Sequence, residues 1–192
     1  KDEYLDIMAN GWLLYQTIVC RLFARSGFYQ SGGALGYRDQ LQDTLSLISS
    51  WPDKTRSQII LHSSKQFEKG DVLHWWHEHN NAGIRTYFSD DYLWLPYVLA
   101  EYVTRTGDIS VLDERTPYLE DKPMNGRREA YDIYHSIEKY DSVIAKALQK
   151  IPDNIQEYDI CTVFIAILDK AIKECESLSL SERELKLLVE IN

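Results

Sequence analysis

Apolar side chains recur every three or four positions along most of this chain, which is the spacing of an amphipathic helix. We find no segment with the alternation of apolar and polar residues that is typical of a half-buried strand. The pattern therefore predicts an all-α fold with at least six helices. The expected helices cover residues 5–25, 37–50, 54–67, 90–106, 127–150, 155–176 and 181–190.

Two segments between these helices have no clear period and are expected to be loops. Residues 26–36 are rich in glycine but lack the Gly-Lys-Ser/Thr ending of a phosphate-binding loop. Residues 74–89 form a longer loop of polar and aromatic side chains, and long ordered loops are usually functional. One glycine, and no tryptophan, follows residue 107. This change of composition suggests two parts, residues 1–125 and a helical C-terminal segment, residues 126–192.

The long loop leads into a helix start that carries two acids. Ser89 suits the N-cap position, and Asp90 and Asp91 then fall in the first turn, where carboxylates are favoured. Together with the indoles of Trp75 and Trp76, these carboxylates suggest a sugar-binding site. The alternatives stay open: the two acids can simply be partners of the helix dipole, and one of the two indoles can belong to the core.

The loop also holds His74, His77 and His79, but their spacing matches neither a zinc finger nor the HExxH pattern, and no cysteine lies near. We expect no metal and no bound cofactor. We also expect the charged Arg38 to lie within hydrogen-bonding reach of Asp39, Asp90 or Asp91, because a charge inside a site needs partners.

Composition narrows the functional classes. The net charge of −9 and a pI near 5.0, with no basic stripe, argue against binding to nucleic acid. Three cysteines lie far apart and are expected to be reduced thiols, which favours a cytoplasmic protein or the cytoplasm-facing part of a larger membrane enzyme. No apolar run reaches the length of about 18 residues that suggests a membrane span. The chain begins with Lys1 and not methionine, so we expect it to be part of a longer protein.

Two long stretches resemble a known family. They are NGWLLYQTIVCRLFARSGFYQSGGALGYRDQLQD, residues 10–43, and LHSSKQFEKGDVLHWWHEHNNAGIRTYFSDDYLWLPYVLAEYVTRTGD, residues 61–108. Both closely resemble glycoside hydrolase family 94, which contains inverting cellobiose- and chitobiose-type phosphorylases and the phosphorylase-like domain of cyclic β-1,2-glucan synthases. The sequence is most similar to the glucan-synthase and β-1,2-oligoglucan phosphorylase branch. The resemblance covers about residues 5–122, and we find none after about residue 149.

The resemblance implies an (α/α)6 barrel, of which this chain would be an incomplete part that the rest of the barrel or a second copy could complete. It implies that Asp90 is the general acid and that Arg38 and Asp39 bind the sugar in the cleaved subsite. Other residues of the same motifs are then candidates for substrate contact, with the tryptophans as platforms for sugar rings: Gln40, Trp75, Trp76, Arg85 and Asp91.

The function implied is phosphorolysis of a β-glucan oligosaccharide to glucose 1-phosphate, with inorganic phosphate as co-substrate. An inverting hydrolase needs an acid and a base, whereas a phosphorylase needs only the acid, because phosphate is itself the nucleophile. However, the chain lacks the GDWNDG-type segment and the later histidine and threonine positions that hold phosphate in the family. The alternative is therefore an inactive, truncated remnant that binds β-glucan or another protein, and a third possibility is a helical scaffold without a ligand.

Overall fold

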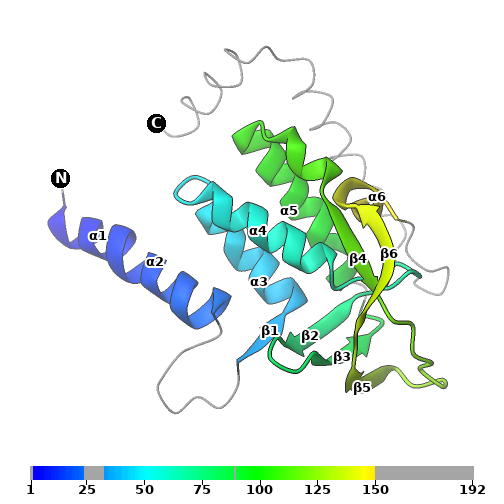
Figure 1. The fold of residues 1–192 in the computed structure, drawn as a ribbon. Coiled ribbons are helices and arrows are strands. Elements are labelled where there is room, and N and C mark those ends of the chain that lie inside the picture. The colour runs from blue at the N-terminus through cyan, green and yellow to red at the C-terminus, as the bar shows by residue number, and fades with distance from the viewer. Residues whose placement is uncertain (1, 24–32, 89, 150–192) are drawn as a thin grey trace.

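The structure is a computed structural model that describes residues 2–23, 33–88 and 90–149. In this part of the chain, helices pack on one side of an antiparallel sheet, and a second, two-stranded sheet lies beside them (Figure 1). The all-α expectation is therefore wrong, and with it the (α/α)6 barrel that the resemblance implied. The fold is mixed, and six strands alternate with its helices.

The chain begins with a continuous helical stretch that stands apart from the body (Figure 1). It consists of α1 (Glu3–Ile7), η1 (Met8–Trp12), α2 (Leu13–Tyr15) and η2 (Gln16–Leu22), where η1 and η2 are π-helical turns. Most of its apolar side chains are exposed, among them Trp12 at 57%. It is attached at its C-terminal end, where the Gln40 amide donates hydrogen bonds to the carbonyl groups of Arg21 and Leu22 at 3.0 and 3.1 Å.

Three longer helices form the body, and their facing sides build the core (Figure 1). They are α3 (Tyr37–Thr44), followed by the 3-10 turn η3 (Leu45–Leu47), α4 (Pro52–Ser63) and α5 (Asp91–Thr106). Leu41, Ile59 and Leu99 contribute one fully buried side chain from each helix. Pro96 lies inside α5, yet the helix continues through it and ends at Gly107, whose φ of 69° permits a left-handed cap.

The predicted loop 74–89 is largely a β-hairpin. β1 (Ala34–Gly36), β2 (Leu73–His77), β3 (Ala82–Thr86) and β5 (Glu129–Ile133) form one antiparallel sheet in the order β1-β2-β3-β5. The hairpin requires glycine at position 83, because an added Cβ would lie 2.6 Å from the Trp75 carbonyl oxygen. Trp76 faces the helices with no exposed area, whereas Trp75 lies beside Tyr131 with a ring separation of 5.9 Å.

The helix predicted over residues 127–150 is also wrong. That stretch holds β5, β6 (Ser136–Ser142) and only one short helix, α6 (Val143–Ala147). β6 pairs with β4 (Arg115–Leu119), which follows the 3-10 turn η4 (Ile109–Asp113). The physical reason is long-range pairing: β5 completes the sheet next to β3, and β-branched and aromatic residues such as Tyr131 and Ile133 suit a strand.

A buried ion pair joins the sheet to the loops around it. The Arg85 guanidinium on β3 is 1% exposed and donates to both carboxylate oxygens of Asp71 at 2.5 and 2.9 Å. It also donates to Asp121 at 2.6 Å and lies 3.9 Å from the centre of the Phe67 ring. One side chain on β3 thus holds the segment before β2 and the segment after β4.

Within the three described ranges, no helix combines the length and the hydrophobicity needed to cross a membrane.

We expect Asp71→Asn to lower the free energy of unfolding by about 3–5 kcal/mol, because it leaves the buried Arg85 charge without its main partner. Asp132→Asn is the matched control, since Asp132 pairs with Lys122 at the surface, where its side chain is 49% exposed, and should change stability by less than about 1 kcal/mol. Urea unfolding of the three proteins measures both values. Similar small losses in both variants would contradict the role assigned to the buried pair.

Candidate functional site

An open cavity of about 290 Å³ lies where the first turns of α3 and α5 meet, and its lining combines charge with aromatic surface. β1 runs directly into α3, which places Arg38 in the first turn of that helix. Asp90 occupies the N-cap position of α5, although its side chain makes no capping hydrogen bond. The lining residues are Arg38, Asp90, Leu93, Trp94 and Tyr97.

An ion pair spans the two helices at this cavity. Arg38 Nη1 lies 2.8 Å from Asp90 Oδ2, and both side chains are about half exposed, at 50% and 47%. The guanidinium carbon of Arg38 also lies 5.8 Å from the centre of the Trp94 ring, within the range of a cation–π contact. The expectation that Arg38 finds a carboxylate partner among these acids is confirmed. Ser89, the expected N-cap, lies outside the described residues.

Asp91 differs sharply from its neighbour Asp90. Its side chain is 2% exposed, and its Oδ2 lies 2.9 Å from His74 Nδ1 on β2. Its Oδ1 has no hydrogen-bond partner among the described residues. Burial raises the pKa of Asp91 from its usual value of 3.8 to about 6, although the hydrogen bond from His74 acts in the opposite direction. Asp91 thus adjoins the cavity without lining it.

Two residues of the GYRDQ motif, Asp39 and Gln40, do not line the cavity. Asp39 Oδ1 lies 3.3 Å from Arg21 Nη2, at the end of the first helical stretch. Gln40 is 2% exposed and binds backbone carbonyl groups of the same stretch. In this structure both residues attach that stretch to α3.

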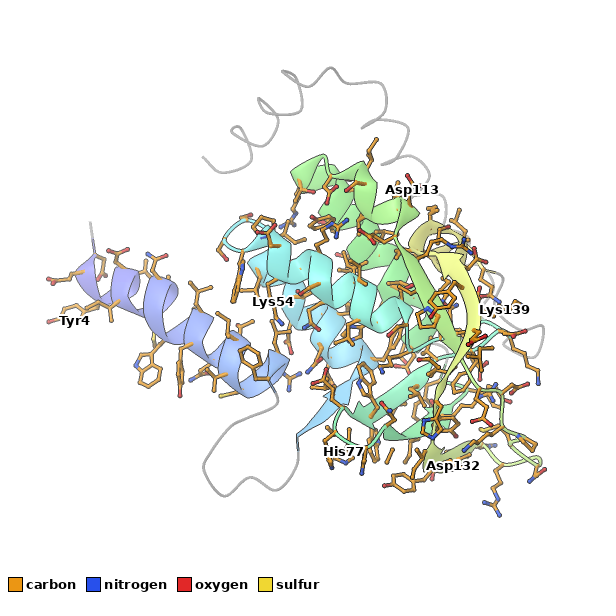
Figure 2. All side chains as sticks on the ribbon, viewed as in Figure 1. Tyr4, Lys54, His77, Asp113, Asp132 and Lys139 are labelled. Carbon is orange, nitrogen blue, oxygen red and sulfur yellow. The ribbon has the colours of Figure 1, made fainter. Side chains whose placement is uncertain are left out.

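The other residues that the sequence predicted as substrate contacts also lie outside the cavity. Trp76 is fully buried and packs edge-on against His62, with 5.2 Å between ring centres. Trp75 lies on the other face of the sheet, with its ring centre 5.4 Å from that of His77, and Figure 2 shows His77 on the side away from the helices. Arg85 belongs to the buried ion pair, so none of these three residues lines the cavity.

Sequence reasoning missed the two aromatic residues that do line it, Trp94 and Tyr97. They follow Asp90 at four and seven positions along α5. That spacing places all three on one face of the helix, so the helical period was a signal that could have identified them. Within the described ranges, no three His, Cys, Asp or Glu side chains gather closely enough to hold a metal ion.

Comparison with known proteins identifies the family to which this chain belongs. The model for the glycosyl hydrolase 94 superfamily, catalytic domain, matches residues 1–154. The chain is 46% identical over 118 residues to the cyclic beta-(1,2)-glucan synthase NdvB of Rhizobium meliloti (strain 1021), which covers 62% of this chain and 4% of the synthase. It is 33% identical over 145 residues to the N,N'-diacetylchitobiose phosphorylase of Vibrio proteolyticus, covering 61% of this chain and 18% of that enzyme.

A solabiose phosphorylase of Paenibacillus borealis is 25% identical over 114 residues, which cover 59% of this chain and 14% of the enzyme. The chain therefore spans less than a fifth of each of these relatives. The family match reaches residue 154, beyond the limit of about residue 122 expected from the motifs, and includes the strands β5 and β6.

The environment of Asp91 predicts a pH dependence of stability. Because the folded state raises its pKa to about 6, the folded protein binds this proton more tightly than the unfolded chain. The resulting stabilisation is fully present below about pH 4 and is lost as the pH rises through about 6. We expect the wild type to lose on the order of 2–3 kcal/mol across this window through Asp91, and Asp91→Asn to lose correspondingly less.

Urea unfolding between about pH 4 and pH 7 measures this difference. Asp113→Asn, which removes an exposed carboxylate, controls for the loss of one negative charge. Parallel pH profiles for the wild type and Asp91→Asn would show that Asp91 does not titrate in this range.

Proposed function

Because this chain belongs to the glycosyl hydrolase 94 superfamily, we propose that it forms part of the sugar site of a β-glucoside phosphorylase. The substrates would be a β-glucan oligosaccharide and inorganic phosphate, and the product glucose 1-phosphate. The similarity to a cyclic beta-(1,2)-glucan synthase supports a β-1,2-linked glucan as the sugar substrate.

The observation that carries this proposal is the Arg38–Asp90 ion pair beside the rings of Trp94 and Tyr97 in one open cavity. A sugar ring has an apolar face and a polar edge. The indole of Trp94 can cover the apolar face, as aromatic rings do for other apolar surfaces. Arg38 supplies donors and Asp90 acceptors for hydroxyl groups at the edge, through charge-assisted hydrogen bonds.

The contacts of Asp90 bear on the general-acid role that the resemblance implies. A general acid must reach the leaving oxygen and carry a proton near neutral pH. Asp90 lines the cavity and meets the first condition. In the free site Asp90 Oδ2 accepts a hydrogen bond from Arg38 Nη1 at 2.8 Å, and a carboxylate in this position can also accept hydrogen bonds from sugar hydroxyl groups.

A second candidate is a β-glucan-binding module without phosphorolysis. Among the described residues that line the cavity, Arg38 is the one cation, and it is already paired with Asp90. The cavity therefore offers little to a phosphate dianion. Release of glucose 1-phosphate from β-1,2-glucan oligomers in the presence of phosphate supports the enzyme, whereas binding without release supports the module.

We expect Trp94→Ala to weaken binding of β-1,2-glucan oligomers about three- to tenfold, because an aromatic contact of this kind contributes about 0.5–1.5 kcal/mol. Isothermal titration calorimetry measures the affinity. Trp51→Ala is the matched control, since Trp51 is 43% exposed and does not line the cavity. Equal affinities of the wild type and Trp94→Ala would count against this cavity as the sugar site.

Asp90→Asn tests the chemical role in the active protein. If Asp90 donates the proton, the variant should lose about 10²–10⁴-fold on the natural glucan and much less on a glycosyl fluoride, whose leaving group needs little protonation. Equal losses on both substrates would assign Asp90 to sugar binding. Asp113→Asn serves as the exposed control.

A further inference from the structure

We propose that His74 is a further substrate-contacting residue of this site and that Asp91 is the residue that positions it. The inference rests on the sugar-binding function proposed above and concerns the same site. Asp91 holds the imidazole of His74 through Nδ1, so that the other ring nitrogen is available to a sugar hydroxyl group.

The pair reaches from the interior to the surface. Asp91 Oδ2 and His74 Nδ1 are 2.9 Å apart, and the side chains are 2% and 36% exposed, respectively. The ring of Phe88 packs edge-on against the imidazole, with 5.0 Å between ring centres. The ring of His74 is thus held by a buried carboxylate and a neighbouring aromatic ring, while about a third of the side chain stays accessible.

The direction of this hydrogen bond determines what His74 can offer. An ionised carboxylate only accepts hydrogen bonds, so His74 Nδ1 carries the proton. In a neutral imidazole Nε2 is then an acceptor with a free lone pair. Among the described residues the His74 ring hydrogen-bonds through Nδ1 to Asp91, and Nε2 takes no part in this bond. This nitrogen can therefore accept a hydrogen bond from a sugar hydroxyl group.

Asp91 also interacts electrostatically with two charged residues that line the cavity. The charges of Asp90 on α5 and Arg38 on α3 both act on the Asp91 carboxyl group, as does His74 on β2. The buried hydroxyl groups of Tyr37 on α3 and Tyr92 on α5 also interact electrostatically with Asp91. Because Asp91 directly follows Asp90 in the chain and contacts His74, we expect the imidazole to offer a further acceptor to a sugar held by the Arg38–Asp90 pair.

This arrangement makes sugar affinity depend on the protonation of Asp91. A protonated Asp91 carboxyl group no longer attracts the Nδ1–H group as an anion does, so it holds the imidazole less firmly in the orientation that presents Nε2. We therefore expect the affinity for the glucan to fall as the pH drops below about 6, the value to which burial raises the pKa of Asp91.

A double-mutant cycle tests the proposal, with calorimetric titration of a β-1,2-glucan pentamer between pH 5 and pH 8. His74→Ala should lower the affinity about tenfold at pH 7.5, which corresponds to about 1.4 kcal/mol. Asp91→Asn should lower it about threefold and flatten the pH profile. The double variant should bind no more weakly than His74→Ala, because Asp91 acts through His74.

Two further variants test whether a loss of affinity is specific to the acceptor nitrogen of His74. His74→Gln keeps an acceptor oxygen near the position of Nε2 and should recover part of the affinity. His135→Ala, which removes an exposed histidine elsewhere in the chain, should bind as the wild type does. Wild-type affinity of His74→Ala, or additive losses in the double variant, would overturn the proposal. Thermal melts establish that each variant is folded.

Nitrogen-15 NMR of the histidine rings separates this inference from the proposed function. In the ligand-free protein at pH 7.5, Nδ1 of His74 should carry the proton and Nε2 should not, and Asp91→Ala should abolish this preference. A preference for the other tautomer would overturn the positioning role even if the glucan binds. The expected tautomer without glucan binding by the wild type would overturn the sugar site and the substrate contact of His74, and leave its orientation by Asp91 intact.

Discussion

The buried guanidinium of Arg85 is the constraint on which the rest of the structure depends. A charge with 1% exposure is stable only when its hydrogen bonds are satisfied, and Asp71 and Asp121 provide them from two separate loops. Arg85 lies on β3, between β2 and β5, so the ion pair also fixes the middle of the sheet. The sheet in turn places β1 in front of α3, and with it Arg38 at the cavity.

α5 and its N-cap residue supply most of the residues that line the cavity. One face of the helix packs into the core through Leu95, Leu99 and Val103, which are buried. Another face presents Asp90, Trp94 and Tyr97 to the cavity. Two adjacent acids at its start therefore have different environments: one pairs with a half-exposed arginine, and the other is buried against His74. The rotation of about 100° between neighbouring helical residues is enough to separate their roles.

The sequence predicted the structure best where the signal comes from residues that are close together in the chain. The period of apolar residues located the helical stretch at residues 3–22, α3, α4 and α5 to within a few residues. It did not show what each helix packs against: the first stretch is apolar over most of its surface, yet its side chains are largely exposed in the described part of the chain. The motifs around the GYRD and SDD segments were sufficient to identify the family, because they are specific in residue type and order.

The sequence by itself determined the family, the main helices and the pairing of Arg38 with one of the neighbouring acids. Only the tertiary structure decided which residues share the site. The strand β5 depends on hydrogen bonds to β3, a segment more than 40 residues away in the chain. The hairpin β2–β3 is local, but its short, mostly buried strands show little periodicity. Trp76 and Arg85 resembled ligand contacts in the sequence but belong to the interior, whereas Trp94 and Tyr97, which no sequence motif indicated, line the cavity.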